Sequence, residues 1–148
     1  MEFKICSSAF TSGGYLPGWY SSTGLNASPP FGWAGEPAGT RSLALVCTSS
    51  RGAVHWVLWN IPNGSKTVYG RIPAERDLPS GMHQGVNDFL ETGWTGPIER
   101  LPDLSLTFKL YALDGHLSIS QDAVTAAMLK AAFNGHLLGE ATVTCAYS

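Results

Sequence analysis

Histidine is the residue type in this sequence best suited to proton transfer near neutral pH, because an unperturbed imidazole titrates near pH 6.5. The chain has four histidines, His55, His83, His116 and His136, which lie far apart in sequence. None stands at the spacing of a zinc motif, so we expect no metal site. The sequence also lacks the serine-hydrolase, dinucleotide, Walker and kinase motifs, and we expect no cofactor. His55, inside the apolar run AVHWVLW, is the remaining candidate for chemistry.

His55 could act as a general acid or base, or as a hydrogen-bonding group for a ligand. The alternative is a strand histidine whose ring is satisfied by a backbone group. Asp88 could be its acidic partner, although side chains of an Asn-Asp pair more often hold their own loop through backbone hydrogen bonds. Glu99 and Asp103 are further possible partners, and Arg51 could supply an anion contact or lie in solvent.

Composition excludes several classes of partner. The formal net charge is −2 without any run of Lys or Arg, so we expect no nucleic-acid binding. No apolar stretch approaches the roughly 20 residues that cross a bilayer, so we expect no membrane insertion. Three cysteines without a C-x-x-C pair, and an N-terminus without a signal-peptide pattern, predict reduced core cysteines in a cytoplasmic protein. Residues 1–148 form one expected domain.

The elements that must position His55 are mostly strands. Continuous apolar or alternating patterns predict them. The expected strands are Phe3–Cys6, Ser42–Thr48, Ala53–Trp59, Leu104–Leu113 and Ala141–Tyr147. The second and third of these are apolar throughout, which indicates burial on both faces.

One helix is expected near the C-terminus. Ser120 is the expected N-cap, the helix formers continue through Phe133, and Asn134-Gly135 is the expected stop. Residues 63–103 show no sustained period, and a stretch of that length usually binds something or hides short elements. The chain is therefore predicted to be mostly β and sandwich-like.

Several segments occur together in a distinctive order. They are Ala27-Ser28-Pro29-Pro30-Phe31 with Trp33, His55–Pro62 (HWVLWNIP), Gln84–Phe89 (QGVNDF), Gly93–Pro97 (GWTGP), Phe108–Asp114 (FKLYALD) and Gly135–Leu138. With these segments, the chain from about Ser8 to Tyr147 resembles the phosphatidylethanolamine-binding protein family, also called Raf kinase inhibitor-like, in its short bacterial form. The resemblance implies an antiparallel β-sandwich with one or two short C-terminal helices. It also implies a small mouth that binds phosphorylated head groups, and a homodimer as found in some bacterial members.

The family's mouth is built from a D-P-D-x-P loop, the His of H-W, a G-P loop and a downstream H-x-Y pair. Here His55, Gly96 and Pro97 match, but Thr48–Gly52 replaces the acidic loop. The H-x-Y pair falls on Leu104 and Leu106. The predicted ligand-binding residues are His55, Ser50, Asp88, Trp94, Gly96, Pro97, Leu104 and Leu106.

Two leucines in place of His and Tyr remove hydrogen-bond donors and add apolar surface. The sequence therefore predicts a small-molecule-binding protein with a largely apolar pocket around His55, and loss of phosphate head-group binding. Two alternatives stay open. One is an enzyme that uses His55 as acid or base for isomerisation, cyclisation or elimination of a small substrate. The other is a regulatory protein–protein interaction module.

Overall fold

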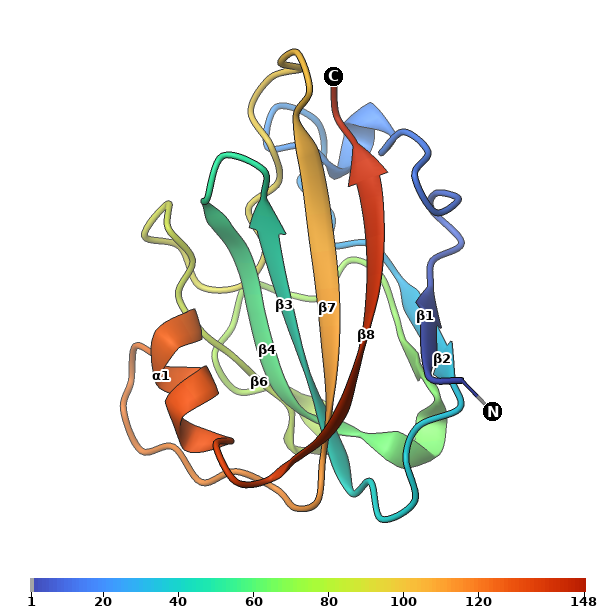
Figure 1. Ribbon diagram of the computed structural model, residues 1–148. Helices are drawn as coiled ribbons and strands as arrows, with labels where there is room; N and C mark the ends of the chain where they lie inside the picture. The colour runs from blue at the N-terminus through green and yellow to red at the C-terminus, as the bar shows by residue number, and fades with distance from the viewer. Residues whose placement is uncertain (1) are drawn as a thin grey trace.

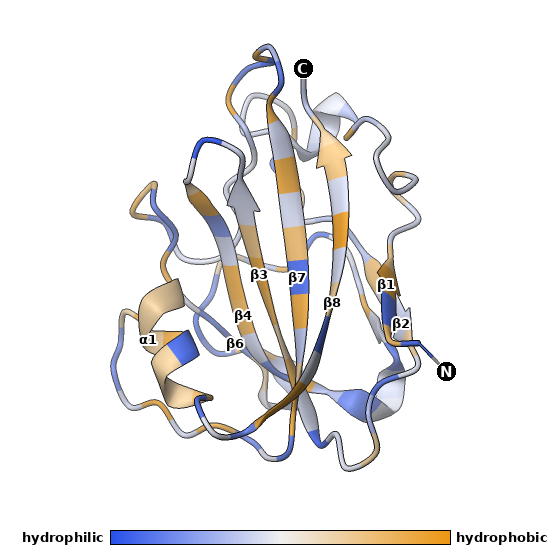
Figure 2. Ribbon diagram, viewed as in Figure 1, coloured by the Kyte–Doolittle hydropathy of each residue, from blue (hydrophilic) through white to orange (hydrophobic). Residues whose placement is uncertain are grey.

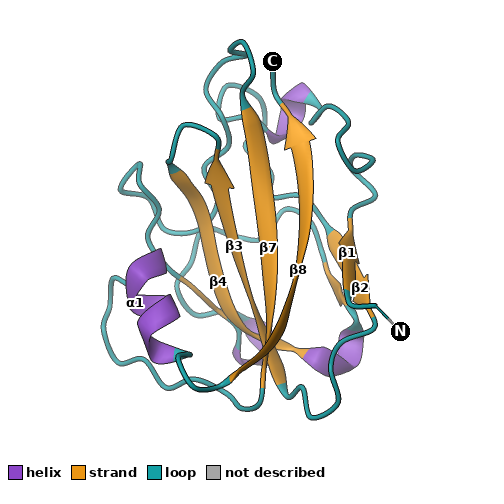
Figure 3. Cartoon of the chain, in the orientation of Figure 1, coloured by secondary structure: helices purple, strands orange, loops and turns teal. Residues whose placement is uncertain are grey.

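The computed structural model describes residues 2–148 and consists of two antiparallel sheets with one α-helix (Figure 1). The five-stranded sheet has the order β6-β4-β3-β7-β8, and the three-stranded sheet has the order β1-β2-β5. The larger sheet contains β3 (Ser42–Ser49), β4 (Val54–Pro62), β6 (His83–Gln84), β7 (Ser105–Leu113) and β8 (Leu137–Ala146). The smaller contains β1 (Lys4–Cys6), β2 (Phe31–Ala34) and β5 (Thr67–Val68), and the helix is α1 (Ala126–Ala132). Short 3-10 turns at Gly18–Tyr20, Asn63–Ser65 and Pro79–Gly81 lie in the connections between strands (Figure 3).

The central strands β3 and β4 are buried on both faces, as their apolar runs predict, whereas β7 alternates between buried and half-buried residues over most of its length. Bands of alternating hydropathy mark β7 in Figure 2. Leu106, Phe108 and Leu110 of this strand join an inner cluster that also contains residues of the small sheet. Tyr111, by contrast, joins an outer cluster with Leu129 of α1. The chain is thus a mostly β sandwich with a single helix over its outer face, in agreement with the expected fold class.

The helix is shorter than the sequence predicts. It begins after Thr125, whose Oγ1 accepts the Met128 N–H at 3.2 Å, and not after Ser120. Residues 118–124 are irregular rather than helical because tertiary contacts hold several of their carbonyl groups. Val86 N–H donates to the Val124 carbonyl at 2.8 Å, and the Arg76 guanidinium donates to those of Ile119 and Gln121. These tertiary hydrogen bonds outweigh the local helix propensity of residues 120–124.

The middle segment, residues 63–103, contains the short strands β5 and β6, and such short elements were one of the two alternatives expected for a stretch of this length. The sequence missed these two strands and β2, because two to four residues carry too little periodicity. β8 begins at Leu137 rather than Ala141, since Leu137 still pairs with Leu113 across an irregular step in the ladder.

Two of the three cysteines lie in the core as expected. Cys47 and Cys145 are buried, and all three thiols are free. Cys6 is exposed, so the expectation of three core cysteines was wrong there: its strand, β1, is two-faced, and only Ile5 points inward. None of the helices in residues 2–148 has the length and apolar character to cross a membrane.

Candidate functional site

A β-bulge in β4 places His55 next to the inner cluster. Thr48 of β3 pairs with Val54 and Cys47 pairs with Trp56, which leaves His55 as the extra residue of the ladder. Val54 packs on the outer cluster and Trp56 belongs to the inner one. The His55 ring lies 6.2 Å from that of Trp94, also in the inner cluster. Bulges beside functional sites commonly redirect a side chain in this way.

The His55 ring opens onto a pocket of about 220 Å³ at the end of the β3–β4 hairpin. The lining residues are Ser49, Arg51, Ala53, His55, Phe89, Pro97, Ile98, Glu99, Leu101 and Leu104. Apolar side chains make up most of this lining, and Arg51 and Glu99 are exposed charged residues. A mostly apolar hollow with a few polar groups is the usual composition of a small-molecule site.

One backbone contact fixes the chemistry of His55. Its Nδ1 lies 2.6 Å from the carbonyl oxygen of Thr95, and a carbonyl can only accept a hydrogen bond. Nδ1 therefore carries the proton, and in the neutral ring Nε2 carries a lone pair. The side chain is 4% exposed, and Phe89, which also lines the pocket, lies 4.9 Å away ring to ring. His55 is thus prepared to accept a hydrogen bond or a proton at Nε2.

Burial keeps this imidazole neutral. Desolvation lowers the pKa of His55 from 6.5, and it outweighs the hydrogen bond to Thr95 and the charge of Asp88, which both act to raise it. At neutral pH the ring is therefore an acceptor and a base. A buried neutral imidazole with this tautomer does not supply the positive charge that a phosphate group prefers.

Asn87 and Asp88 hold the loop beside His55. The Asp88 carboxylate accepts the Val54 N–H at 2.7 Å, and the Asp88 N–H donates to the Val54 carbonyl at 2.9 Å. Asn87 Nδ2 donates to the Gly93 carbonyl at 3.0 Å and to Thr95 Oγ1 at 2.9 Å. These bonds join the loop to β4 one residue before His55 and bring Phe89 to the pocket.

The Gly96-Pro97 loop is held from the opposite side by the N-terminal part of the chain. Gly96 N–H donates to Asn26 Oδ1 at 2.8 Å. A Cβ atom at Gly96 would come within 2.1 Å of the Tyr20 carbonyl oxygen, so only glycine allows this approach. Ser22 N–H donates to the Pro97 carbonyl at 3.0 Å. The loop thus forms a fixed wall of the pocket.

The structure brings three of the eight predicted ligand-binding residues, His55, Pro97 and Leu104, to the pocket. The other five, Ser50, Asp88, Trp94, Gly96 and Leu106, are not lining residues of this pocket. Trp94 donates from Nε1 to the Tyr20 carbonyl at 3.0 Å and is buried, whereas Leu106 is fully buried in the inner cluster.

Ser50 has a place at the hairpin end. Its Oγ accepts the Ser105 N–H at 3.0 Å and thereby joins the end of β3 to the start of β7. In the turn formed by residues 49–53, Ser49 Oγ accepts hydrogen bonds from the backbone N–H groups of Arg51 and Ala53. This turn brings Arg51 to the rim, where its guanidinium donates to the Pro102 carbonyl at 3.0 Å.

Sequence reasoning did not assign Ser49, Ala53, Phe89, Ile98 and Leu101 to the pocket. Ser49, Ala53, Phe89 and Ile98 each lie within two residues of a predicted position, and that proximity was the available signal. Ile98 and Leu101 belong to an irregular segment without period, whose side-chain directions only the folded chain defines.

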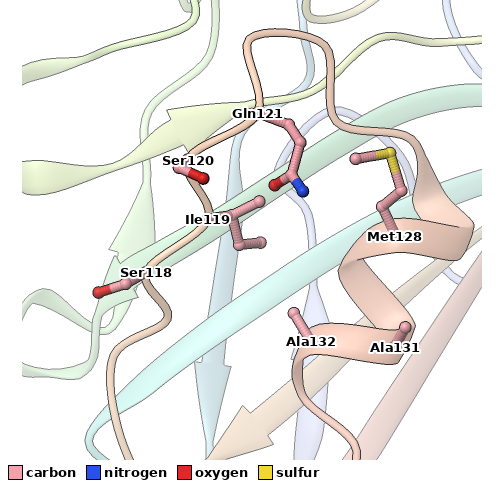
Figure 4. Close-up of a pocket in the computed structure, with 7 residues that line it drawn as sticks. All are labelled: Ser118, Ile119, Ser120, Gln121, Met128, Ala131 and Ala132. Atoms are coloured by element: carbon pink, nitrogen blue, oxygen red, sulfur yellow. The ribbon is translucent and has the colours of Figure 1, made fainter.

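A larger hollow of about 480 Å³ lies elsewhere, between residues 118–121 and α1 (Figure 4). Figure 4 shows it lined by Ser118, Ile119, Ser120, Gln121, Met128, Ala131 and Ala132. None of these side chains titrates near neutral pH, so this hollow is the poorer candidate for chemistry despite its size. Among residues 2–148, no group of three or more His, Cys, Asp or Glu side chains could hold a metal ion.

Comparison with known proteins identifies the scaffold. The model of the phosphatidylethanolamine-binding protein family matches residues 6–148. The chain belongs to this family. A UPF0098 protein of Methanothermobacter thermautotrophicus is 38% identical over 143 residues, which cover 94% of each chain. UPF0098 protein YbhB of Escherichia coli is 27% identical over 157 residues and covers 98% of this chain and 99% of its own.

Solved structures of phosphatidylethanolamine-binding protein relatives share the fold over the full length. Escherichia coli YbcL, described as a member of the mammalian family, superposes with a TM-score of 0.86 at 27% identity, covering 100% of this chain and 99% of its own. A putative family homologue from Chlamydia trachomatis gives a TM-score of 0.85 at 26% identity, covering 99% and 97%.

Proposed function

We propose that this phosphatidylethanolamine-binding protein relative binds a small, largely apolar molecule in the His55 pocket, and that the ligand donates one hydrogen bond to His55 Nε2. The carrying observation is the 2.6 Å contact between Nδ1 and the Thr95 carbonyl, which makes Nε2 the acceptor. Phe89, Pro97 and Leu104 then supply the apolar walls that favour the body of the ligand.

The pocket volume limits the size of the ligand. An engineered apolar cavity of about 150 Å³ in another protein holds benzene, and drug-sized ligands occupy about 300–1,000 Å³. At about 220 Å³, this pocket suits a molecule somewhat larger than benzene. A complete phospholipid exceeds it.

Loss of phosphate head-group binding is part of the same proposal. A phosphate needs several donors or positive charges, and each lost charge-assisted hydrogen bond costs about 1.5–3 kcal/mol. Here the lining has Leu104 and a neutral imidazole, and the positive charge of Arg51 shares the rim with the negative charge of Glu99. These features favour an uncharged ligand.

A matched pair of probes tests the hydrogen bond. p-Cresol and toluene have the same apolar body, and only p-cresol donates a hydrogen bond. Calorimetry at pH 7.5 is expected to show p-cresol binding about 2–12-fold more tightly, the equivalent of one net hydrogen bond. Equal affinity for the two probes, or tighter binding of inorganic phosphate at this pocket, contradicts the proposal.

A matched pair of variants tests the location. Ala53→Leu places a larger side chain in the pocket lining, whereas Ala123→Leu makes the same change at an exposed position. Binding of p-cresol is expected to be lost in the first variant and kept in the second. Circular dichroism checks that both variants are folded.

The same geometry favours one second candidate, an enzyme that moves a proton on a small substrate. Its specific support is the neutral His55 ring, a base at Nε2, in one pocket with the carboxylate of Glu99. Turnover of a small carbonyl or enol compound that disappears in His55→Gln, while p-cresol still binds the folded variant, supports the enzyme over a simple binding protein.

A further inference from the structure

A second, polar hollow lies on the outer face of the five-stranded sheet, away from the His55 pocket. Its volume is about 120 Å³, and its lining residues are Val46, Thr48, Thr107, Lys109, Tyr111 and Lys130. Five of the six carry a hydroxyl or an ammonium group. The hollow therefore differs in chemistry from the apolar pocket beside His55.

Strand register explains why these groups meet. Thr107, Lys109 and Tyr111 alternate along β7 and so share one face, opposite to Leu106, Phe108 and Leu110 of the inner cluster. Thr48 pairs directly with Thr107, and Val46 pairs with Lys109. Lys130, in the last turn of α1, completes the lining from above the sheet. The body of the sheet thus separates this hollow from the inner cluster.

The polar groups of the hollow are left without hydrogen-bond partners inside the protein. Within residues 2–148, no hydrogen bond involves the Thr48, Thr107 or Tyr111 hydroxyls, or the Lys109 or Lys130 ammonium groups. Tyr111 is the most telling case. The residue is 6% exposed and its ring packs on Phe133 at 4.8 Å, yet it lines the hollow and its hydroxyl has no partner in the described chain. This hydroxyl is not fully enclosed by protein, so it is accessible from the hollow and available to a ligand.

The charge of the hollow is positive. Lys109 has one acidic neighbour, Glu140, at an Nζ–Oε1 distance of 3.8 Å, which is too long for a hydrogen bond. Lys130 forms no ion pair within the part of the chain that the structure describes. Two ammonium groups and one loosely placed carboxylate leave one net positive charge. Burial and the charge of Glu140 raise the pKa of Tyr111, so its hydroxyl keeps its proton and can donate.

We propose that this hollow, lined by Thr48, Thr107, Lys109, Tyr111 and Lys130, binds a phosphate-type oxyanion. All five groups can donate hydrogen bonds, and two carry positive charge, which is the donor set that a tetrahedral oxyanion requires. A volume of about 120 Å³ equals about four water molecules at about 30 Å³ each, enough for one phosphate group and too small for a nucleotide or a lipid. The site would be separate from the His55 pocket, with which it shares no lining residue.

The test is titration of the folded protein with inorganic phosphate, followed by two-dimensional amide NMR at constant ionic strength. Saturable shifts are expected at Thr48, Thr107, Lys109 and Lys130. Phosphoethanolamine, titrated in parallel, separates the two sources of the group. Equal or tighter binding of this ester indicates a phosphomonoester ligand, and binding of inorganic phosphate alone indicates the free ion. Both results support the site.

Matched variants exclude a general charge effect. Lys109→Met and Lys130→Met are each expected to weaken phosphate binding about tenfold or more, since each removes a charge-assisted hydrogen bond. Lys4→Met removes the same charge from an exposed lysine that pairs with Glu2 at 3.7 Å, and is expected to change binding less than twofold. Tyr111→Phe removes only the hydroxyl and is expected to weaken binding about 2–10-fold.

Three results overturn the proposal. They are the absence of saturable shifts at this face, shifts confined to the His55 pocket, and equal weakening by Lys4→Met and Lys130→Met.

Discussion

The amide of Asn87 is the side chain on which the loop beside His55 depends most. We expect Asn87→Ala to destabilise the protein and to weaken ligand binding together. The residue is 3% exposed, so its hydrogen-bonding groups cannot be replaced freely by water. Its Oδ1 accepts the N–H groups of Phe89 at 2.9 Å and Glu91 at 3.2 Å, and its Nδ2 donates to Gly93 and Thr95.

Four of the five side-chain hydrogen bonds of Asn87 set the magnitude, because the fifth, to the His55 carbonyl, is long at 3.5 Å. At about 0.5–1.5 kcal/mol net for each bond, the sum is about 2–6 kcal/mol. Glu91 is exposed, so water can satisfy its N–H, whereas the Gly93 carbonyl belongs to a buried residue. A loss of about 3 kcal/mol is therefore the expected value, which lowers Tm by roughly 6–12 °C for a chain of this size.

Urea denaturation at pH 7.5 measures this loss as a change in the free energy of unfolding. The matched control is Asn134→Ala, whose exposed side chain forms no hydrogen bond within residues 2–148. Calorimetry with p-cresol at a temperature where both variants are folded then tests the link to the pocket, because Phe89 lines it. A loss below 1 kcal/mol, or one equal to that of Asn134→Ala, refutes the assignment of Asn87 as the anchor of this loop.

Three further predictions follow from the same contacts. In Gly96→Ala, the new Cβ would lie 2.1 Å from the Tyr20 carbonyl oxygen, which is a steric clash. Urea denaturation should therefore show that the free energy of unfolding falls by about 1–3 kcal/mol or more. The pKa of His55 is lower in the folded state than in the unfolded state, so the unfolded state takes up the proton first as the pH falls. Stability should therefore fall as pH drops below about 6.5 through the lowered folded pKa, and this slope should shrink in His55→Gln; a slope unchanged by the substitution contradicts it. A thiol reagent at pH 8 should label exposed Cys6 rapidly and Cys145 only after unfolding, because burial raises the pKa of Cys145 to about 12; rapid modification of more than one thiol refutes this.

Much of the sandwich was predictable because its long strands show recognisable patterns of apolar residues in their own sequence. The runs at Ser42–Ser49 and Val54–Pro62 are apolar on both faces, and the alternation in β7 separates the two clusters correctly. The short strands β2, β5 and β6 contain no such signal. They exist because neighbouring strands supply their hydrogen-bond partners.

The helix start illustrates the same limit in another form. Residues 120–125 have sequence features of a helix N-terminus, but Arg76 and Val86, about 40 residues earlier in the chain, donate to the carbonyl groups of Gln121 and Val124 in an irregular segment. A hydrogen bond between residues about 40 positions apart produces no recognisable hydrophobic pattern in the local sequence. Prediction from local pattern therefore placed the start five residues too early.

By itself, the sequence determined the family and the mostly β fold, and it singled out His55 as the candidate site residue, because these depend on motifs and periodicity along the chain. Only the tertiary structure decided what His55 can do. The bulge opposite Thr48 directs the ring, the Thr95 carbonyl selects its tautomer, and burial removes its positive charge. Each of these is a contact between segments distant in sequence or a property of enclosed space, and neither exists until the chain has folded.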